Sequence, residues 1–233
     1  MQTHGYKDLA GIYDLLNQNK DYAGEAAFLE TLFRKYRVRT VLDVGCGTGT
    51  HMQLLEKAGF SCTGMDMNLE MLNVARRKVK GPLIQADMTD FNLVKYNAII
   101  CMFAAFNHLL SPKLAMNALK RFDAHLHNGG IILIDLHNPS GNGEKTDCVD
   151  GITRTMKWQY NPATRIEESE VVFDINGTKI QDSHKMRIYS IDEMLQMVRE
   201  AGFIESAVYK GYGFETALPT SKNLEVFARK NIS

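Results

Sequence analysis

The feature that most constrains the fold is a regular alternation of strand-like and helix-like segments between residues 40 and 136. Segments typical of strands lie at 40–44, 61–66, 83–86, 96–102 and 131–136, and 96–102 is apolar almost throughout, as a strand covered on both faces should be. The segments between them carry helix signals, such as Ser111-Pro112, a serine N-cap followed by proline at the first helical position. Such alternation predicts right-handed crossovers and a parallel sheet with helices on both faces.

From about Gly151 the pattern changes to extended segments. Residues 154–160, 165–175 and 179–189 are each typical of strands, and Asn176-Gly177 between the last two is a favoured hairpin turn. A capping box at Ser190 then opens a further helix, and strands are expected at 203–209 and 223–229. We therefore predict an α/β protein, a Rossmann-like doubly wound sheet with an antiparallel β insertion.

The length of 233 residues suits one domain. Its expected parts are a helical N-terminal segment (1–39), a ligand-binding core (40–150), the antiparallel insertion (151–189) and a C-terminal helix with the last strands of the sheet (190–233).

Charge and hydropathy exclude several classes of function. The 27 basic residues equal the 27 acidic residues, which argues against a nucleic-acid partner, because binding a polyanion usually leaves a basic excess. No apolar run reaches the roughly 18 residues of a membrane span, and the N-terminus has no secretion-signal pattern. We expect a cytoplasmic protein without a membrane partner. The four cysteines lie far apart without a CxxC pair, so no metal site is predicted.

A glycine-rich turn, DVGCGTGT at 43–50, follows the first predicted strand. Open α/β sheets bind nucleotide-like ligands at this place. A dinucleotide fingerprint requires glycine or alanine at the sixth position from Gly45, where this chain has Thr50. Asp43, just before the turn, would repel a pyrophosphate and suits a ligand with positive charge. An NAD-dependent oxidoreductase is therefore disfavoured.

Two further acidic residues follow the next strands. Asp66 lies 21 residues after Gly45, the usual distance for an acid that accepts hydrogen bonds from ribose hydroxyls. Asp87, after the third strand, is placed to accept a hydrogen bond from an exocyclic amine such as that of adenine. The glycine turn and these two acids predict a nucleoside-binding site.

These residues belong to five ordered stretches: VLDVGCGTGT at 41–50, GMDMNLEML at 64–72, QADMTDF at 85–91, YNAIICMFAAFNHL at 96–109 and HNGGIILID at 127–135. Together they resemble the class I S-adenosylmethionine-dependent methyltransferases. The nearest motifs are those of the amino-sugar N-methyltransferases that act on sugar nucleotides and of the glycine/sarcosine N-methyltransferases. The resemblance implies a seven-stranded sheet and methyl transfer from S-adenosyl-L-methionine to a small-molecule acceptor, with S-adenosyl-L-homocysteine as product.

The resemblance also implies which residues bind the methyl donor. The expected set is Asp43, Gly45, Cys46 and Gly47 around the methionine part, Asp66 and Met67 at the ribose and adenine, Asp87 and Met88 at the adenine edge, and Met102 and Tyr22 beside them. Residues 1–39 are expected to form a helical lid that places Tyr13 over the donor.

The acceptor is less defined by the sequence. An amine nitrogen is preferred, while a small hydroxyl or carboxyl acceptor and a non-catalytic S-adenosylmethionine-binding protein remain alternatives. His108 follows the fourth strand and is the leading candidate for a general base, with Tyr13 as a second candidate catalytic residue. His137, just past the fifth strand, is a weaker candidate base.

Two expectations concern metal and oligomeric state. No second carboxylate is expected beside Asp135, and an activated sulfonium needs no Lewis acid, so transfer is predicted to be metal-independent. The antiparallel insertion is expected to cover the acceptor side or to pair two subunits as a homodimer.

Overall fold

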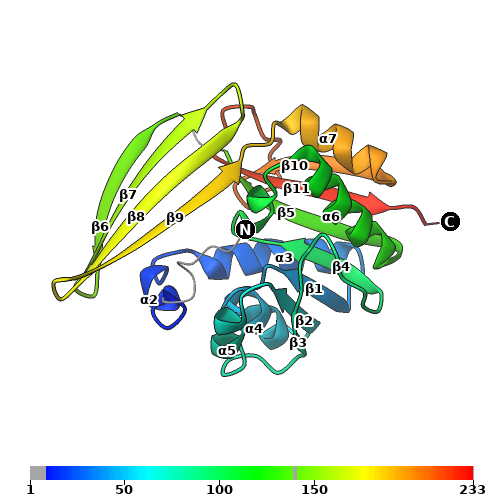
Figure 1. Ribbon diagram of the computed structural model, residues 1–233. Coiled ribbons are helices and arrows are strands. Elements are labelled where there is room, and N and C mark those ends of the chain that lie inside the picture. Colours follow the sequence, from blue (N-terminus) through cyan, green and yellow to red (C-terminus); the bar gives the residue numbers. More distant parts are fainter. Residues whose placement is uncertain (1–8, 139–140, 233) are drawn as a thin grey trace.

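The computed structural model describes residues 9–138 and 141–232 and contains two separate sheets (Figure 1). A seven-stranded sheet has the order β10-β11-β5-β4-β1-β2-β3, and a four-stranded sheet has the order β6-β7-β8-β9. The predicted seven-stranded sheet with an antiparallel insertion is confirmed. No helix of the described residues is long and apolar enough to cross a membrane.

The seven-stranded sheet is parallel except for one strand, which lies next to an edge. Its strands are β1 (Thr40–Val44), β2 (Ser61–Asp66), β3 (Leu83–Gln85), β4 (Tyr96–Cys101), β5 (Leu126–His137), β10 (Phe203–Lys210) and β11 (Asn223–Lys230). Only β11 runs antiparallel to its neighbours β5 and β10. The strand order reverses between β1 and β4, and open α/β sheets place ligands at such a switch point.

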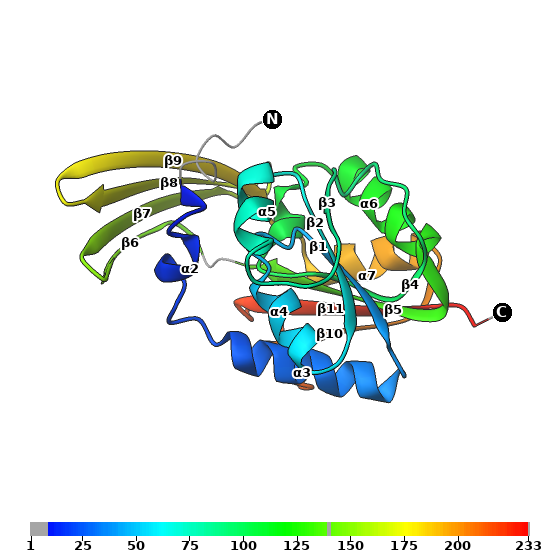
Figure 2. The same cartoon turned by 90° about the horizontal axis from the view of Figure 1, so that it is seen from below.

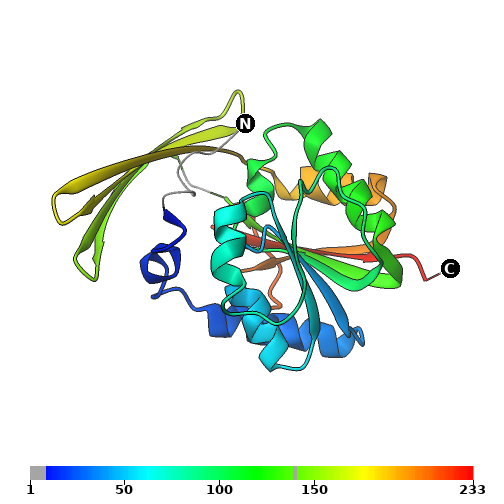
Figure 3. The same ribbon diagram turned by 60° about the horizontal axis from the view of Figure 1, so that its bottom comes forward.

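Helices cover both faces of this sheet. Helices α3 (Tyr22–Lys35) and α4 (Thr50–Lys57) pack on one face, α6 (Pro112–Ala124) and α7 (Ile191–Glu200) on the other, and α5 (Leu69–Ala75) follows β2. Figure 3 shows the blue and cyan helices and the green and orange helices on opposite sides of the sheet. Buried strand residues alternate between the two cores, as Val41 and Leu42 do.

The predicted helix starts are confirmed. Asn68, Ser111 and Ser190 each occupy the N-cap and accept hydrogen bonds from backbone N–H groups of the first helical turn. These caps fix where α5, α6 and α7 leave the strand ends, and so they fix the loops that border the site.

The insertion differs from the prediction at its beginning. It consists of β6 (Gly143–Val149), β7 (Ile152–Asn161), β8 (Ile166–Ile175) and β9 (Thr178–Arg187), paired antiparallel in sequence order. The prediction of three strands from about Gly151 was therefore wrong by one strand, and the expected core (40–150) was too long. The missed strand, GEKTDCV, lies at the edge of the sheet, where polar residues are tolerated and the apolar signal is weak.

The N-terminal segment packs against this insertion. Leu9 precedes α2 (Tyr13–Leu16), and Leu16 is the last residue of this helix. Both leucines form a small core with Ile152, Val171 and Phe173 of the four-stranded sheet. Figure 2 shows α2 lying against the curved four-stranded sheet and α3 running along the body. The first eight residues of the predicted lid lie outside the described residues.

Candidate functional site

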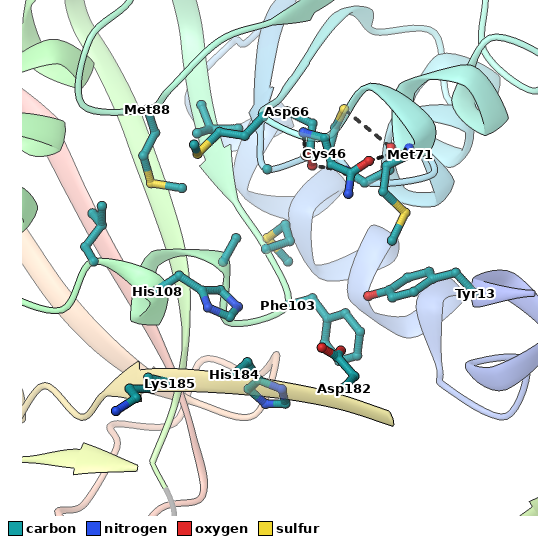
Figure 4. Close-up of a pocket in the computed structure, with 18 of the residues that line it drawn as sticks. Tyr13, Cys46, Asp66, Met71, Met88, Phe103, His108, Asp182, His184 and Lys185 are labelled. Atoms are coloured by element: carbon teal, nitrogen blue, oxygen red, sulfur yellow. Dashed lines mark hydrogen bonds between the residues drawn. The ribbon is translucent and has the colours of Figure 1, made fainter. Parts of the chain in front are cut away.

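A cavity of about 1430 Å³ opens at the carboxyl ends of β1, β2, β3 and β4, and the four-stranded sheet bounds its far side. The near wall contains the glycine turn and Asp66, and the far wall contains Asp182 and His184 of β9 (Figure 4). His108 lies on the short 3₁₀ helix η1 (Ala105–His108), which follows β4 and also lines the cavity. The insertion thus lines the side of the cavity opposite the glycine turn, and that this side receives the acceptor stays a prediction.

The glycine turn approaches η1 closely. Gly45 and Gly47 have left-handed φ angles of 70° and 53°. A Cβ on Gly45 would lie 2.7 Å from the Cβ of Ala105, whereas a Cβ on Gly47 would meet nothing within 4 Å. Glycine is thus required at the first position by the contact with the Ala105 side chain as well as by its φ angle, and the second position borders open space.

Asp66 is held at the cavity wall by backbone donors. Its Oδ2 accepts the N–H of Gly47 at 2.8 Å and its Oδ1 accepts the N–H of Asn68 at 2.8 Å. Each carboxylate oxygen keeps a second acceptor site, which suits a ligand with two adjacent hydroxyl groups. Burial raises the pKa of Asp66, and the backbone hydrogen bonds oppose this rise.

Apolar and polar groups meet at the next strand end. The side chains of Met67, Met71 and Met88 line the cavity, and Met67 remains 60% exposed although it is apolar. Asp87 also lines the cavity, and its Oδ1 accepts hydrogen bonds from the N–H and the hydroxyl of Thr89 at 2.7 and 2.8 Å. Flexible thioether side chains beside a carboxylate suit an aromatic base that carries an amino group.

Tyr13 reaches the cavity because α2 is anchored beside the glycine turn. Asp14 accepts hydrogen bonds from the hydroxyl of Thr48 at 2.5 Å and from the Lys78 ammonium at 2.6 Å. Tyr13 contacts Phe103 edge to face, with ring centroids 6.4 Å apart. Phe103 itself has a left-handed φ of 54°, a conformation that is rare outside glycine and often marks functional sites.

His108 is positioned by its neighbour Asn107. The fully buried Asn107 side chain donates to the carbonyls of Arg187 and His137 and accepts the N–H of His137, so it ties η1 to β9 and β5. Burial, with a smaller effect of the charge of His184, lowers the pKa of His108 to about 4. Burial also lowers the pKa of His184, whose ring centroid lies 6.0 Å from that of His108. Both imidazoles are therefore neutral at neutral pH.

Comparison with known proteins decides the family. Residues 41–130 match a family model described as a methyltransferase domain. The chain is 30% identical to the dTDP-3-amino-3,6-dideoxy-alpha-D-glucopyranose N,N-dimethyltransferase of Streptomyces fradiae, over 92% of each protein. The chain belongs to the S-adenosylmethionine-dependent methyltransferases.

Two further similarities agree with this methyltransferase family. A glycine/sarcosine/dimethylglycine N-methyltransferase of Actinopolyspora halophila is 31% identical over 54% of this chain and 24% of that enzyme. An S-adenosylmethionine-dependent methyltransferase of Clostridium acetobutylicum ATCC 824 has the same fold, with a TM-score of 0.84 at 18% identity, over 97% of this chain and 99% of that one. The predicted family resemblance is confirmed.

The residues of this methyltransferase fit its donor, S-adenosylmethionine. The open space at Gly47, the acceptor sites on Asp66 and the methionine-lined wall match a ribose diol joined to an aromatic base. The predicted donor residues that line the cavity are Gly45, Cys46, Gly47, Asp66, Met67, Asp87, Met88, Met102 and Tyr22, and the predicted catalytic residues Tyr13 and His108 also line it.

Asp43 has a different place from the one predicted. It is 1% exposed, does not line the cavity and has no hydrogen-bond partner for Oδ2 among the described residues. Strand alternation explains this, because Asp43 lies on the same face of the sheet as Val41, whereas Leu42 and Val44 belong to the core on the other face. Burial raises the pKa of Asp43 to about 6, an effect that the His51 charge opposes.

Two expectations at the end of β5 were wrong. His137 does not line the cavity, because β5 continues through it and its Nε2 lies 3.5 Å from Oε2 of Glu167. Asp135 does have a second carboxylate beside it, since Glu225 of β11 is its direct cross-strand partner. Asp135 accepts the hydroxyl of Tyr212 at 2.6 Å and the N–H of Phe103 at 2.8 Å, and neither acid lines the cavity.

Sequence reasoning did not identify the far wall. Ser169 and Val171 of β8 are buried and pair with His184 and Asp182 of β9, so these four residues share the inner face of the insertion and line the cavity. The polar and apolar alternation of the predicted hairpin was the available signal, but it does not say which face meets the body.

Proposed function

We propose that this methyltransferase transfers a methyl group to the amine nitrogen of a small molecule. The observation that carries the proposal is the pair of imidazoles, His108 and His184, whose ring centroids lie 6.0 Å apart on the wall opposite the donor-binding turn. An alkylammonium has no free lone pair, so an amine acceptor must lose a proton before it is methylated. A neutral imidazole at the cavity wall is able to accept that proton.

Each group of residues at the site would have a separate role in the reaction. When bound, S-adenosylmethionine supplies a methyl group that is already activated on a sulfonium. The glycine turn and Asp66 would hold the donor, and Tyr13 and Phe103 would close the cavity above it and exclude water. His108 would take the proton of the acceptor amine at its imidazole nitrogen. Most of the rate enhancement would come from holding the acceptor in line with the transferable methyl group.

The low pKa of His108 limits its strength as a base. At a pKa of about 4 it accepts a proton from an ordinary alkylammonium only at a considerable free-energy cost. The same burial would lower the pKa of an amine bound in the cavity, because desolvation disfavours every charged form. We propose that this shared desolvation brings the two pKa values closer.

The amino group of a sugar is the preferred acceptor. The similarity to the Streptomyces fradiae amino-sugar dimethyltransferase covers 92% of this chain and so includes most of the insertion that forms the acceptor wall. The similarity to the glycine/sarcosine/dimethylglycine enzyme covers only 54%. The two imidazoles would serve a hydroxyl acceptor as well, so the similarity to the amino-sugar enzyme is what favours an amine over a hydroxyl.

The test is an acceptor screen with S-adenosylmethionine as donor. Nucleotide-linked and free amino sugars, glycine, sarcosine, simple amines and phenols would be compared by S-adenosylhomocysteine release, with mass spectrometry of the product. We expect release with amino sugars and a product that carries new methyl groups on nitrogen. Exclusive methylation of phenols or carboxylates, or no turnover with any acceptor, would contradict the proposal.

A homodimer through the insertion is a separate proposal. Strands β6 and β9 are the two edges of the four-stranded sheet, and unpaired edges are surfaces where another chain can add. Light scattering after size-exclusion chromatography measures the mass directly. A monomer at micromolar concentration would contradict it.

A further inference from the structure

The acceptor side of the cavity contains a carboxylate to which the reaction has so far given no role. Asp182 of β9 lies opposite Val171 and two residues before His184, so it is on the inner face of the insertion. Figure 4 shows Asp182 and His184 rising from β9 toward the space between His108, Phe103 and Tyr13. All five of these side chains line the cavity.

Asp182 is half-buried, and the charged groups further along its strand are engaged elsewhere. Lys185 forms a salt bridge with Glu168, and Arg187 forms one with Glu193. No salt bridge to Asp182 is formed within residues 9–138 and 141–232. Burial raises the pKa of Asp182, and a hydrogen bond from the backbone N–H of Ser183 opposes this rise. A half-buried carboxylate without a salt bridge is stabilised most by a cation that enters the cavity.

The remaining walls also suit a cation. Tyr13 and Phe103 meet edge to face beside the carboxylate. Aromatic rings attract ammonium groups, and the Phe103 ring already has one, the Lys20 ammonium, 4.8 Å from its centroid. His108 and His184 are uncharged and do not repel a cation. The two lysines that also line the cavity, Lys157 and Lys185, are each in a salt bridge, with Glu144 and Glu168. The carboxylate, the two aromatic rings and the two neutral imidazoles therefore form a site for an alkylammonium rather than for an anion.

We propose that Asp182 binds the acceptor's amino group in its ammonium form and holds it between His108 and the rings of Tyr13 and Phe103. This inference rests on the proposed amine methylation and narrows its substrates to amines that are protonated in solution. A neutral hydroxyl acceptor gains nothing comparable from the carboxylate.

Asp182 would also stabilise the positive charge while the proton moves from the amine to His108. One N–H bond of the ammonium breaks and one N–H bond forms on the His108 imidazole, which leaves the amine its lone pair. The positive charge moves from the amine to the imidazole and stays beside the same carboxylate. The Asp182 charge raises the pKa of His108 and so stabilises the imidazolium that the transfer produces.

The first test uses the amine found in the acceptor screen. Asp182→Asn is expected to raise the acceptor KM by about 10- to 100-fold, the value of one charged hydrogen bond, and to leave the KM for S-adenosylmethionine unchanged. Asp182→Glu should restore part of the acceptor affinity. Glu215→Gln removes an exposed carboxylate that does not line the cavity and should change neither constant. An acceptor KM of Asp182→Asn within twofold of wild type would overturn the inference and leave amine methylation intact.

The second test is independent of turnover. Calorimetry on the protein saturated with S-adenosylhomocysteine would compare choline with its uncharged isostere 3,3-dimethylbutan-1-ol. We expect choline to bind at least 10-fold more tightly, and Asp182→Asn to abolish the difference. Equal binding of the two probes, or binding of neither, would overturn the ammonium site even if the screen finds an amine substrate. Failure of the screen with preferential choline binding would instead count against the proposed reaction alone.

Discussion

Glu225 should make the folded protein less stable as the pH rises toward neutrality. It is fully buried on β11, directly opposite Asp135, and neither of its side-chain oxygens has a hydrogen-bond partner among the described residues. Burial, with a smaller contribution from the Asp135 charge, raises its pKa from 4.5 to about 7. The folded protein therefore holds this proton over a pH range in which the unfolded chain has lost it.

The linkage between protonation and folding gives the sign and size of the change in the free energy of unfolding. A raised folded-state pKa gives stability that is fully present below 4.5 and is lost as the pH rises through 7. The difference of about 2.5 between the two pKa values, at 1.36 kcal/mol for each pH unit, amounts to about 3 kcal/mol. Most of it, about 2.5 kcal/mol, is lost between roughly pH 5 and pH 8.

The perturbation is Glu225→Gln, which keeps the shape of the protonated side chain and removes its titration. Free energies of unfolding would be measured by urea denaturation at several pH values between 5 and 8 for wild type and variant. Other buried groups titrate in both proteins and cancel in the difference. We expect the variant to gain about 2–3 kcal/mol on wild type as the pH rises across this range. Parallel stability curves would refute the reasoning, and Glu215→Gln, at an exposed site, should give such parallel curves.

Four further predictions concern the site. Asp66→Ala should weaken S-adenosylmethionine binding by about 1.5–3 kcal/mol, because a charged acceptor is lost; unchanged affinity by calorimetry would contradict its assignment. Asp14→Ala should free α2 from Thr48 and Lys78 and speed its amide hydrogen exchange by about 10-fold, whereas unchanged exchange would mean that the helix is held elsewhere. His108→Ala should lower the turnover rate by about 10²–10⁴-fold with donor affinity intact; a rate within a few-fold of wild type would remove it as the base. Activity should survive a strong chelator, and recovery of lost activity by magnesium would disprove metal independence.

The alternating part of the fold was predictable because several local signals agree. A nearly continuous apolar run predicted β4, and the alternation with helix signals predicted β1 and β2. The N-caps Asn68 and Ser111 predicted the starts of α5 and α6. Strand β6 escaped because its charged residues carry no apolar run, and it exists through pairing with β7. Local sequence patterns thus identify strands that are buried in the core. They miss an edge strand such as β6, which is stabilised mainly by hydrogen bonds to its neighbour β7.

The donor side was predictable for a similar reason. Gly47 and Asp66 lie 19 residues apart, yet both follow parallel strands whose ends meet at one edge of the sheet, where they form a hydrogen bond. Asp135 and Glu225 show the limit of this reasoning. Their proximity depends on the register between β5 and β11, distant in sequence, and no motif indicates it.

The acceptor wall depends on register even more strongly. Residues of β8 and β9 alternate, so a shift of one position would turn Asp182 and His184 to the outer face and bring Ser183 and Lys185 inward. The outer face carries Glu168 and Lys185, a pair that suits solvent. Burial of Val171 and Phe173 against the N-terminal segment fixes the register and thereby directs Asp182 into the cavity. The contacts that attach the N-terminal segment to the insertion therefore also determine which charge the acceptor meets, so substitutions in this small apolar core should alter acceptor affinity as well as stability.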